Sequence, residues 1–173
     1  MANIDNFKAK LTGGGARPNL FKVICNFPAD AGGDTELASF LIKGAGLPAS
    51  VIAPIEVPYR GRKLKVAGDR TFEPWTITVI NDEGFVIRNA FEKWMNSINE
   101  HIGNVGLLNP NDYQTDMEVH QLGKDDTILK KVDLKGVFPT NLSQIELNYE
   151  TNDTIEEYTV ELQYQYWTSN TTS

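Results

Sequence analysis

The stretch 71–98 constrains the fold most, because its hydrophobic period changes from two to about 3.6 partway along. Apolar and polar side chains alternate over residues 71–80, which predicts a strand with one covered face. Asp82 is suited to cap a helix start. Beyond it, apolar side chains recur at spacings of four, three and four, which predicts an amphipathic helix packed on a sheet. The apolar stripe of this helix, interpreted as core packing, consists of Ile87, Phe91, Trp94 and Ile98, widened by Ala90 and Met95.

The rest of the chain contains many period-two segments that predict further strands. Turn residues at 123–126 and 150–153 predict hairpins between the last of them. Besides 71–80, the predicted strands are 20–27, 37–43, a long bent strand pair within 51–66, 115–122, 127–137, 144–149 and 154–167. This pattern predicts a mainly β fold of the α+β class, an antiparallel sandwich or partly closed barrel with one amphipathic helix.

A length of 173 residues fits one domain with a sizeable core. Residues 1–17 are predicted to form an N-terminal arm. In this arm Ile4, Phe7 and Leu11 have the spacing of one or two helical turns before a glycine run interrupts them. Residues 18–167 form the single predicted domain, and residues 168–173 form a polar tail.

Charge and composition exclude several classes of protein. The formal net charge of −7 argues against a general affinity for nucleic acid or anionic membranes. The apolar runs are far too short to cross a bilayer and no signal peptide is visible, so we expect a soluble protein made in a cytoplasm. The single cysteine, Cys25, rules out an internal disulfide framework and is predicted to be a buried apolar residue.

No segment has a convincing catalytic or ligand-binding pattern. A degenerate dinucleotide fingerprint at 44–49 is broken by Pro48 and followed by a β-like segment. The oxygen-rich segment 109–116 lacks the glycine and glutamate of a calcium loop. His101 and His120 have no second ligand at a useful spacing. We therefore predict no enzyme, no cofactor and no metal site.

The segment 59–66 is the clearest functional candidate that the residues provide. It holds four cations within six residues, Arg60, Arg62, Lys63 and Lys65, beside Leu64 and Val66. A nucleic-acid patch is disfavoured, because Tyr59 is the one aromatic stacking group of the segment and the whole chain is acidic. A basic, half-apolar arm on an acidic body favours self-association, in which the arm docks on an acidic face of another copy.

Five separated blocks of sequence match a known pattern in order and in register. They are residues 16–23 (ARPNLFKV), 62–72 (RKLKVAGDRTF), 75–83 (WTITVINDE), 135–141 (KGVFPTN) and 164–167 (YQYW). Through these blocks the chain resembles the tail tube protein of contractile-tailed (myovirus) bacteriophages over most of residues 16–167. The loops 28–34 and 101–114 and the tail after residue 167 depart from the pattern, so no role is inherited for them.

The resemblance implies a β-barrel-like subunit that forms homohexameric rings, which stack into a tube inside a contractile sheath. The tube is then the inner conduit of the virion tail for DNA ejection, assembled in the host cytoplasm. The implied partners are other copies of the chain, the tail sheath protein, the tape measure protein, and the baseplate and tail-terminator proteins. DNA is implied to pass an acidic lumen wall without specific binding, and no membrane is involved.

Two sets of residues are candidates for this assembly. The resemblance implies that the second, third, fifth and sixth predicted strands line the lumen, and there we select Glu56, Asp116 and Glu118 as wall carboxylates. The segment through Arg17 and the arm 59–66 are selected for ring stacking. The inter-subunit candidates are Arg17, Tyr59, Arg60, Arg62, Lys63, Leu64, Lys65 and Val66.

Other functions stay open at this point. The tube of a type VI secretion system or of a bacteriocin-like contractile injection system shares the fold but conducts no packaged DNA, and a neighbouring portal or capsid gene distinguishes a phage from these. A carbohydrate-binding β module with exposed Trp or Tyr comes from a different class, and a glycan screen tests it. An enzyme has the least support, because no paired nucleophile and base is found.

Overall fold

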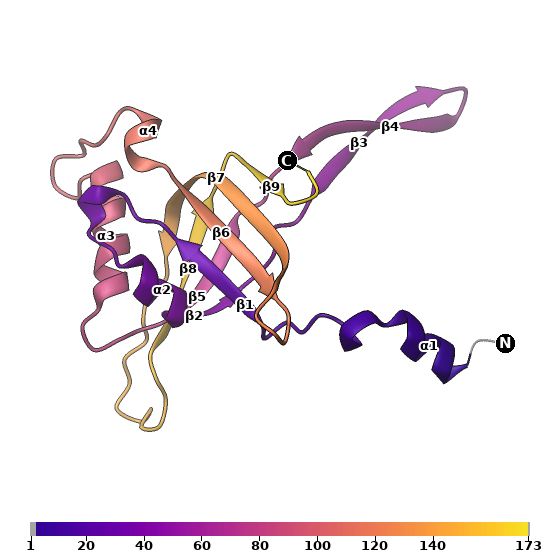
Figure 1. The fold of residues 1–173 in the computed structure, drawn as a ribbon. Coiled ribbons are helices and arrows are strands. Elements are labelled where there is room, and N and C mark those ends of the chain that lie inside the picture. The colour runs from indigo at the N-terminus through magenta and orange to yellow at the C-terminus, as the bar shows by residue number, and fades with distance from the viewer. Residues whose placement is uncertain (1–2, 173) are drawn as a thin grey trace.

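The computed structural model describes residues 3–172, so the predictions for residues 1–2 and 173 lie outside the described residues. The body is a folded antiparallel sheet with helix α3 (Val86–Ile98) against it, and a β-hairpin and an N-terminal helix project away from it (Figure 1). The strands are β1 (Phe21–Cys25), β2 (Ile42–Ala45), β3 (Val51–Tyr59), β4 (Arg62–Thr71), β5 (Trp75–Ile80), β6 (Thr115–Leu122), β7 (Ile128–Leu142), β8 (Glu157–Gln163) and β9 (Tyr166–Ser169). The shorter helices are α1 (Ile4–Lys10), α2 (Thr35–Leu41) and α4 (Pro110–Tyr113), with 3-10 turns η1 (Thr12–Gly14) and η2 (Ala29–Ala31).

Strand β7 joins the two halves of the main sheet. Its first part pairs with β6 and β9, and residues 138–142 pair with β8 on the other half. The strand order is β1-β6-β7-β8-β5-β2, so β1 and β2 remain edges of the described sheet. The predicted mainly β, antiparallel architecture is confirmed, with the sheet folded over the core but not closed into a barrel.

Gly136 lies where β7 passes from one half of the sheet to the other. Its φ of 65° is in the left-handed region, and a Cβ there would lie 2.7 Å from Cγ of Gln165. We expect Gly136→Ala to lower the free energy of unfolding by about 1–3 kcal/mol, because strain and a steric clash coincide. Urea unfolding measures this. Gly46→Ala is the matched control, since a Cβ at Gly46 meets nothing within 4 Å; equal losses in the two variants would contradict the explanation.

Helix α3 covers the core as predicted. Ile87, Phe91 and Trp94 are each 1% exposed or less. The Phe91 ring stacks on Trp94 with centroids 6.1 Å apart, and Phe27 meets Phe91 edge-on at 5.2 Å. Cys25 is fully buried, as predicted, and its burial raises the pKa of the thiol. The interpretation of the stripe as core packing is therefore confirmed.

The start of α3 differs from the prediction. The helix begins after Phe85, which is left-handed with φ 52° and has no side-chain cap. Asp82 lies in the preceding turn, where its carbonyl accepts a hydrogen bond from the Phe85 N–H at 3.0 Å. The prediction that Asp82 caps this helix is wrong, because Asp82 opens the tight turn that precedes the first helical residue, Val86.

The predicted strand at 37–43 is wrong. Those residues are mostly helix α2, and the strand β2 begins only at Ile42. Asp34 caps this helix, since its Oδ1 accepts from the N–H groups of Glu36 and Leu37. Short capped helices also form at α1 and α4, in addition to the predicted amphipathic helix.

Residues 143–156 form a long loop between β7 and β8 instead of the predicted strand 144–149 and its hairpin turn. Its apolar side chains Leu147, Tyr149 and Ile155 are at least 70% exposed, so no strand within residues 3–172 covers them. The predicted strand 154–167 is likewise two strands, β8 and β9. Strand β9 continues to Ser169, which is buried, so the first part of the predicted polar tail pairs with β7.

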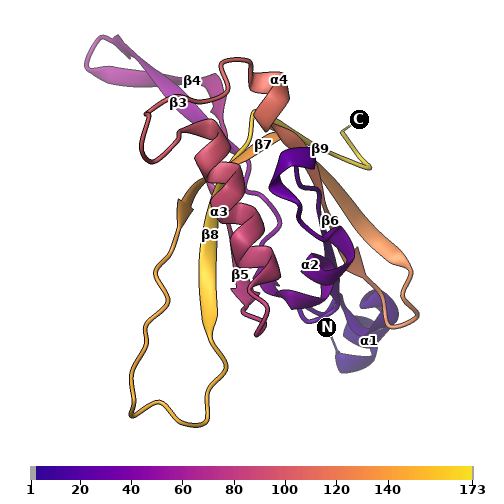
Figure 2. The same ribbon diagram turned by 90° about the vertical axis from the view of Figure 1, so that its left-hand side faces the viewer.

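The long strand pair predicted within 51–66 is confirmed as the β3–β4 hairpin, extended to Thr71. The hairpin leaves the body and points away from it in both views (Figures 1 and 2). In the described residues, no helix is long and apolar enough to cross a membrane.

Candidate functional site

The projecting β3–β4 hairpin has one apolar face that nothing in the described chain covers. The cross-strand register places Ile55 opposite Val66 and Val57 opposite Leu64, with Tyr59 next along the same face. All five side chains are between 45% and 67% exposed. An isolated two-stranded hairpin is at best marginally stable in water. A contiguous apolar face of this kind marks an interaction surface.

The hairpin is also strongly basic. Between Val51 and Thr71 it carries five cations against two carboxylates, Glu56 and Asp69, although the whole chain has a net charge of −7. Lys63 forms an ion pair with Glu56. Arg62 forms no ion pair with any other residue of 3–172, and Arg60 lies 5.5 Å from the centre of the Tyr59 ring. The structure thus gathers the predicted arm residues on one exposed projection.

The N-terminal segment is a second projection. Asn3 caps α1 by accepting from the Asp5 and Asn6 N–H groups. Ile4 and Phe7 are more than 60% exposed, so the predicted apolar turn is helical and is left uncovered by the rest of residues 3–172. Arg17 ends this segment, and its carbonyl accepts a hydrogen bond from Gln121 Nε2 at 2.7 Å, which ties the segment to β6.

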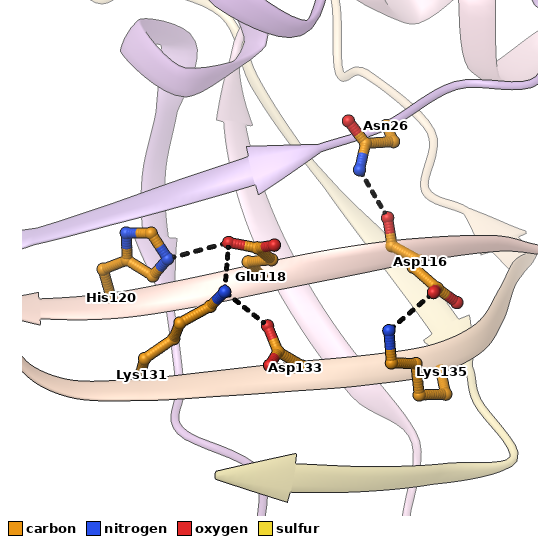
Figure 3. A network of polar contacts seen from close by, with 7 residues as sticks. All are labelled: Asn26, Asp116, Glu118, His120, Lys131, Asp133 and Lys135. Carbon is orange, nitrogen blue, oxygen red and sulfur yellow. Dashed lines mark hydrogen bonds and ion pairs between the residues drawn. The ribbon is translucent and has the colours of Figure 1, made fainter. Parts of the chain in front are cut away.

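The candidate carboxylates lie in two different places. Asp116 and Glu118 are neighbours on the outer face of β6, whereas Glu56 lies on the hairpin. Asp116 pairs with Lys135 of β7 at 2.7 Å, and Glu118 pairs with Lys131 at 3.2 Å (Figure 3).

The same face contains further polar contacts. Lys131 also contacts Asp133 at 3.2 Å, and Asn26 donates to the Asp116 carbonyl at 2.8 Å (Figure 3). His120, which sequence spacing left without a partner, lies 2.9 Å from Glu118. The period-two alternation of β6 places both side chains near each other, so spacing two along a strand was the available signal. On this face, lysines offset most of the carboxylate charge.

Burial by itself raises the pKa of the Glu118 carboxyl, but hydrogen bonds from Lys131 and His120 outweigh burial and hold this pKa below its ordinary value. Hydrogen bonds to Glu118 and Asp133 raise the pKa of Lys131. The Glu118 contribution to stability is therefore present above the ordinary carboxyl pKa and is lost as the pH falls through the depressed value.

We expect Glu118→Gln to lower the free energy of unfolding by roughly 0.5–1 kcal/mol at neutral pH, because the pair is partly solvent-screened. The loss should shrink as the pH falls through the depressed pKa of the Glu118 carboxyl, because the parent chain then loses the same charge. Urea unfolding over a series of pH values measures it. Glu146→Gln is the control, since this exposed residue forms no ion pair within residues 3–172; a loss that persists at low pH would contradict the assignment.

An acidic loop that was not predicted from the sequence spans residues 143–156. It carries four carboxylates and no lysine or arginine, and it encloses a cleft of about 620 Å³. The signal available in the sequence was a segment that contains four carboxylates and no lysine or arginine. In the part of the chain that is described, no group of three or more His, Cys, Asp or Glu residues is placed to hold a metal ion.

Comparison with known proteins gives consistent results. The family model described as phage tail tube protein matches residues 16–170. The chain is 34% identical over 164 residues to tail tube protein gp19 of Enterobacteria phage T4, covering 94% of this chain and 97% of that protein. It is 32% identical over 168 residues to the tail tube protein of Serratia phage KSP90, covering 95% of each.

Solved structures share the fold. A chain of the anti-feeding prophage baseplate has a TM-score of 0.65 at 12% identity, covering 89% of this chain and 94% of that one. A chain of the sheath–tube complex of an extracellular contractile injection system has a TM-score of 0.59 at 16% identity, covering 98% and 99%. At these identities the likeness concerns the fold alone.

Proposed function

Since the chain belongs to the phage tail tube protein family, we propose that it assembles into stacked homohexameric rings that form the inner tube of a contractile tail. The tube is a structural part of the virion and the conduit for DNA ejection. The observation that carries the proposal is the exposed, amphipathic and basic β3–β4 hairpin. No other part of residues 3–172 covers this surface, which supports a neighbouring molecule as its cover.

The hairpin and the N-terminal segment are the proposed ring-stacking elements. Both expose apolar side chains on projections with few contacts to the body. A contact between different surfaces of identical copies is heterologous, so it can repeat without limit along an axis. Residues 59–66 would then make the contact between rings, and Arg17 would fix the direction in which the N-terminal segment leaves the body.

We propose that Asp116 and Glu118 face the lumen on β6, with Glu56 contributing from the hairpin. Proteins that bind DNA electrostatically neutralise its phosphates with lysine and arginine side chains. On this face Lys131 and Lys135 are already engaged by carboxylates. A wall of this kind has few free cations for phosphates, so DNA can pass without adhering.

The proposed partners are the tail sheath, tape measure, baseplate and tail-terminator proteins, with assembly in the host cytoplasm. Solved chains of this fold lie in a baseplate and in a sheath–tube complex, which supports the same surroundings here. The proposed role is structural and needs no catalysis. In line with this, the buried Cys25 thiol has a raised pKa, which disfavours the nucleophilic thiolate.

The second candidate is the tube of a contractile injection system without packaged DNA. The likeness to such tubes favours it, but only at the level of the fold. The phage relatives match at more than 30% identity over almost the whole chain, which favours the phage tail.

Negative-stain electron microscopy of the purified chain tests the proposal. We expect six-fold rings, and tubes of stacked rings at high protein concentration. Compact monomers at every concentration, even when a preassembled baseplate is supplied to start growth, would overturn it.

A further inference from the structure

The hairpin and the acidic loop lie at opposite ends of the molecule. In two views that share a vertical axis, the hairpin projects from the top of the body and loop 143–156 extends below it (Figures 1 and 2). Copies stacked along such an axis bring the hairpin of one molecule toward the loop of the next. Both segments have few contacts with their own body.

The two segments are complementary in charge. The tip 59–66 carries four cations and no carboxylate, and the acidic loop carries four carboxylates and no cation. Within residues 3–172, Glu146, Glu150 and Asp153 form no ion pair, and neither do Arg60 and Arg62. Opposite charges that lack partners within the chain favour pairing between chains, because complementary potentials steer association and fix register.

The two segments are also complementary in polarity. The loop encloses a cleft of about 620 Å³ whose lining includes Leu147, Tyr149 and Ile155, all at least 70% exposed. The hairpin presents Tyr59 and Leu64, which are 67% and 61% exposed. Contact between them would remove apolar surface from water on both molecules.

We propose that the acidic loop of one subunit is the docking site for the hairpin tip of a subunit in the adjacent ring. The inference rests on the proposed function and names the partner surface of the hairpin. Leu64 enters the cleft beside Tyr149, and Arg60 and Arg62 meet Glu150 and Asp153. The contact is heterologous, so each ring keeps a free set of hairpins at one end and a free set of loops at the other.

Charge reversal with compensation is the first test. We expect Glu146→Lys/Glu150→Lys/Asp153→Lys to shorten tubes at least tenfold, and Arg60→Glu/Arg62→Glu to do the same. A chain that carries both sets should recover tubes, because the pairing is restored with opposite sign. Loop reversal that leaves tube length unchanged, or a combined chain that fails to recover, would overturn the inference.

Disulfide cross-linking is the second test. In tubes of the Leu64→Cys/Tyr149→Cys chain, oxidation should produce a ladder of linked chains on a non-reducing gel. The buried Cys25 does not compete. Leu64→Cys/Leu108→Cys is the matched control, since Leu108 is 98% exposed on a different loop, and it should give no ladder.

The outcomes separate the two proposals. Tubes without a ladder, or a ladder from Leu64→Cys/Phe7→Cys instead, would overturn the docking site while the tube function stands. A parent chain that yields neither rings nor tubes would overturn the proposed function itself.

Discussion

Charge reversal by Arg62→Glu/Lys63→Glu is expected to reduce tube assembly at least tenfold while the subunit stays folded. Arg62→Glu replaces an attractive contact between rings by a repulsive one, and Lys63→Glu removes the pair with Glu56 and adds a second negative charge to the same tip. Like charges brought together at an interface oppose association by several kcal/mol. The contact recurs for every subunit of a ring, so small changes per copy add up. Electron microscopy of assembled tubes measures the loss.

The hairpin is outside the core, so the thermal midpoint of the variant should stay within a few degrees of that of the parent chain. Lys93→Glu/Lys124→Glu is the control: both lysines are exposed and lie away from the hairpin, and the change in net charge is the same. Tubes of normal length from the hairpin variant, or equal loss from the control, would contradict the assigned role of the hairpin.

The substitution Phe91→Ala is expected to lower the free energy of unfolding by about 3–5 kcal/mol. Phe91 is fully buried and its ring stacks on Trp94 and meets Phe27 edge-on, so truncation leaves a cavity that the two remaining aromatic rings cannot readily fill. Stabilities of single domains are about 5–15 kcal/mol, so the loss is a large share of the total. Urea unfolding measures it.

Lys93→Ala on the same helix is the matched control. This side chain is exposed, and a surface substitution should change stability by no more than about 0.5 kcal/mol. A loss below about 1 kcal/mol for Phe91→Ala would show that α3 does not close the core.

The periodic pattern of polar and apolar side chains correctly predicted those elements that bury one face against the core. Strand β6 has the predicted bounds, and the stripe of α3 is buried as expected. Pairing partners could not be predicted in the same way. Strand β7 changes partner between Val137 and Phe138, just after Gly136, and nothing local shows that one strand serves both halves of the sheet.

The errors at α2 and at loop 143–156 share a cause. Short apolar segments such as 37–43 fit both a strand and a helix, and the Asp34 cap decides between them. Residues 144–149 alternate like a strand, but they pair with no strand among residues 3–172, so they remain a loop.

The sequence by itself determined that the chain is a mainly β domain with one aromatic helix face in its core and a basic, half-apolar arm. These are local properties, set by periodicity and charge within short windows. Only the tertiary structure decided that the basic arm and the acidic loop stand at opposite ends, that Asp116 and Glu118 are offset by Lys135 and Lys131, and that the sheet stays open. Those features depend on contacts between residues far apart in the chain. They are stabilised by packing, strand pairing and ion pairs between separate segments, so no single segment determines them.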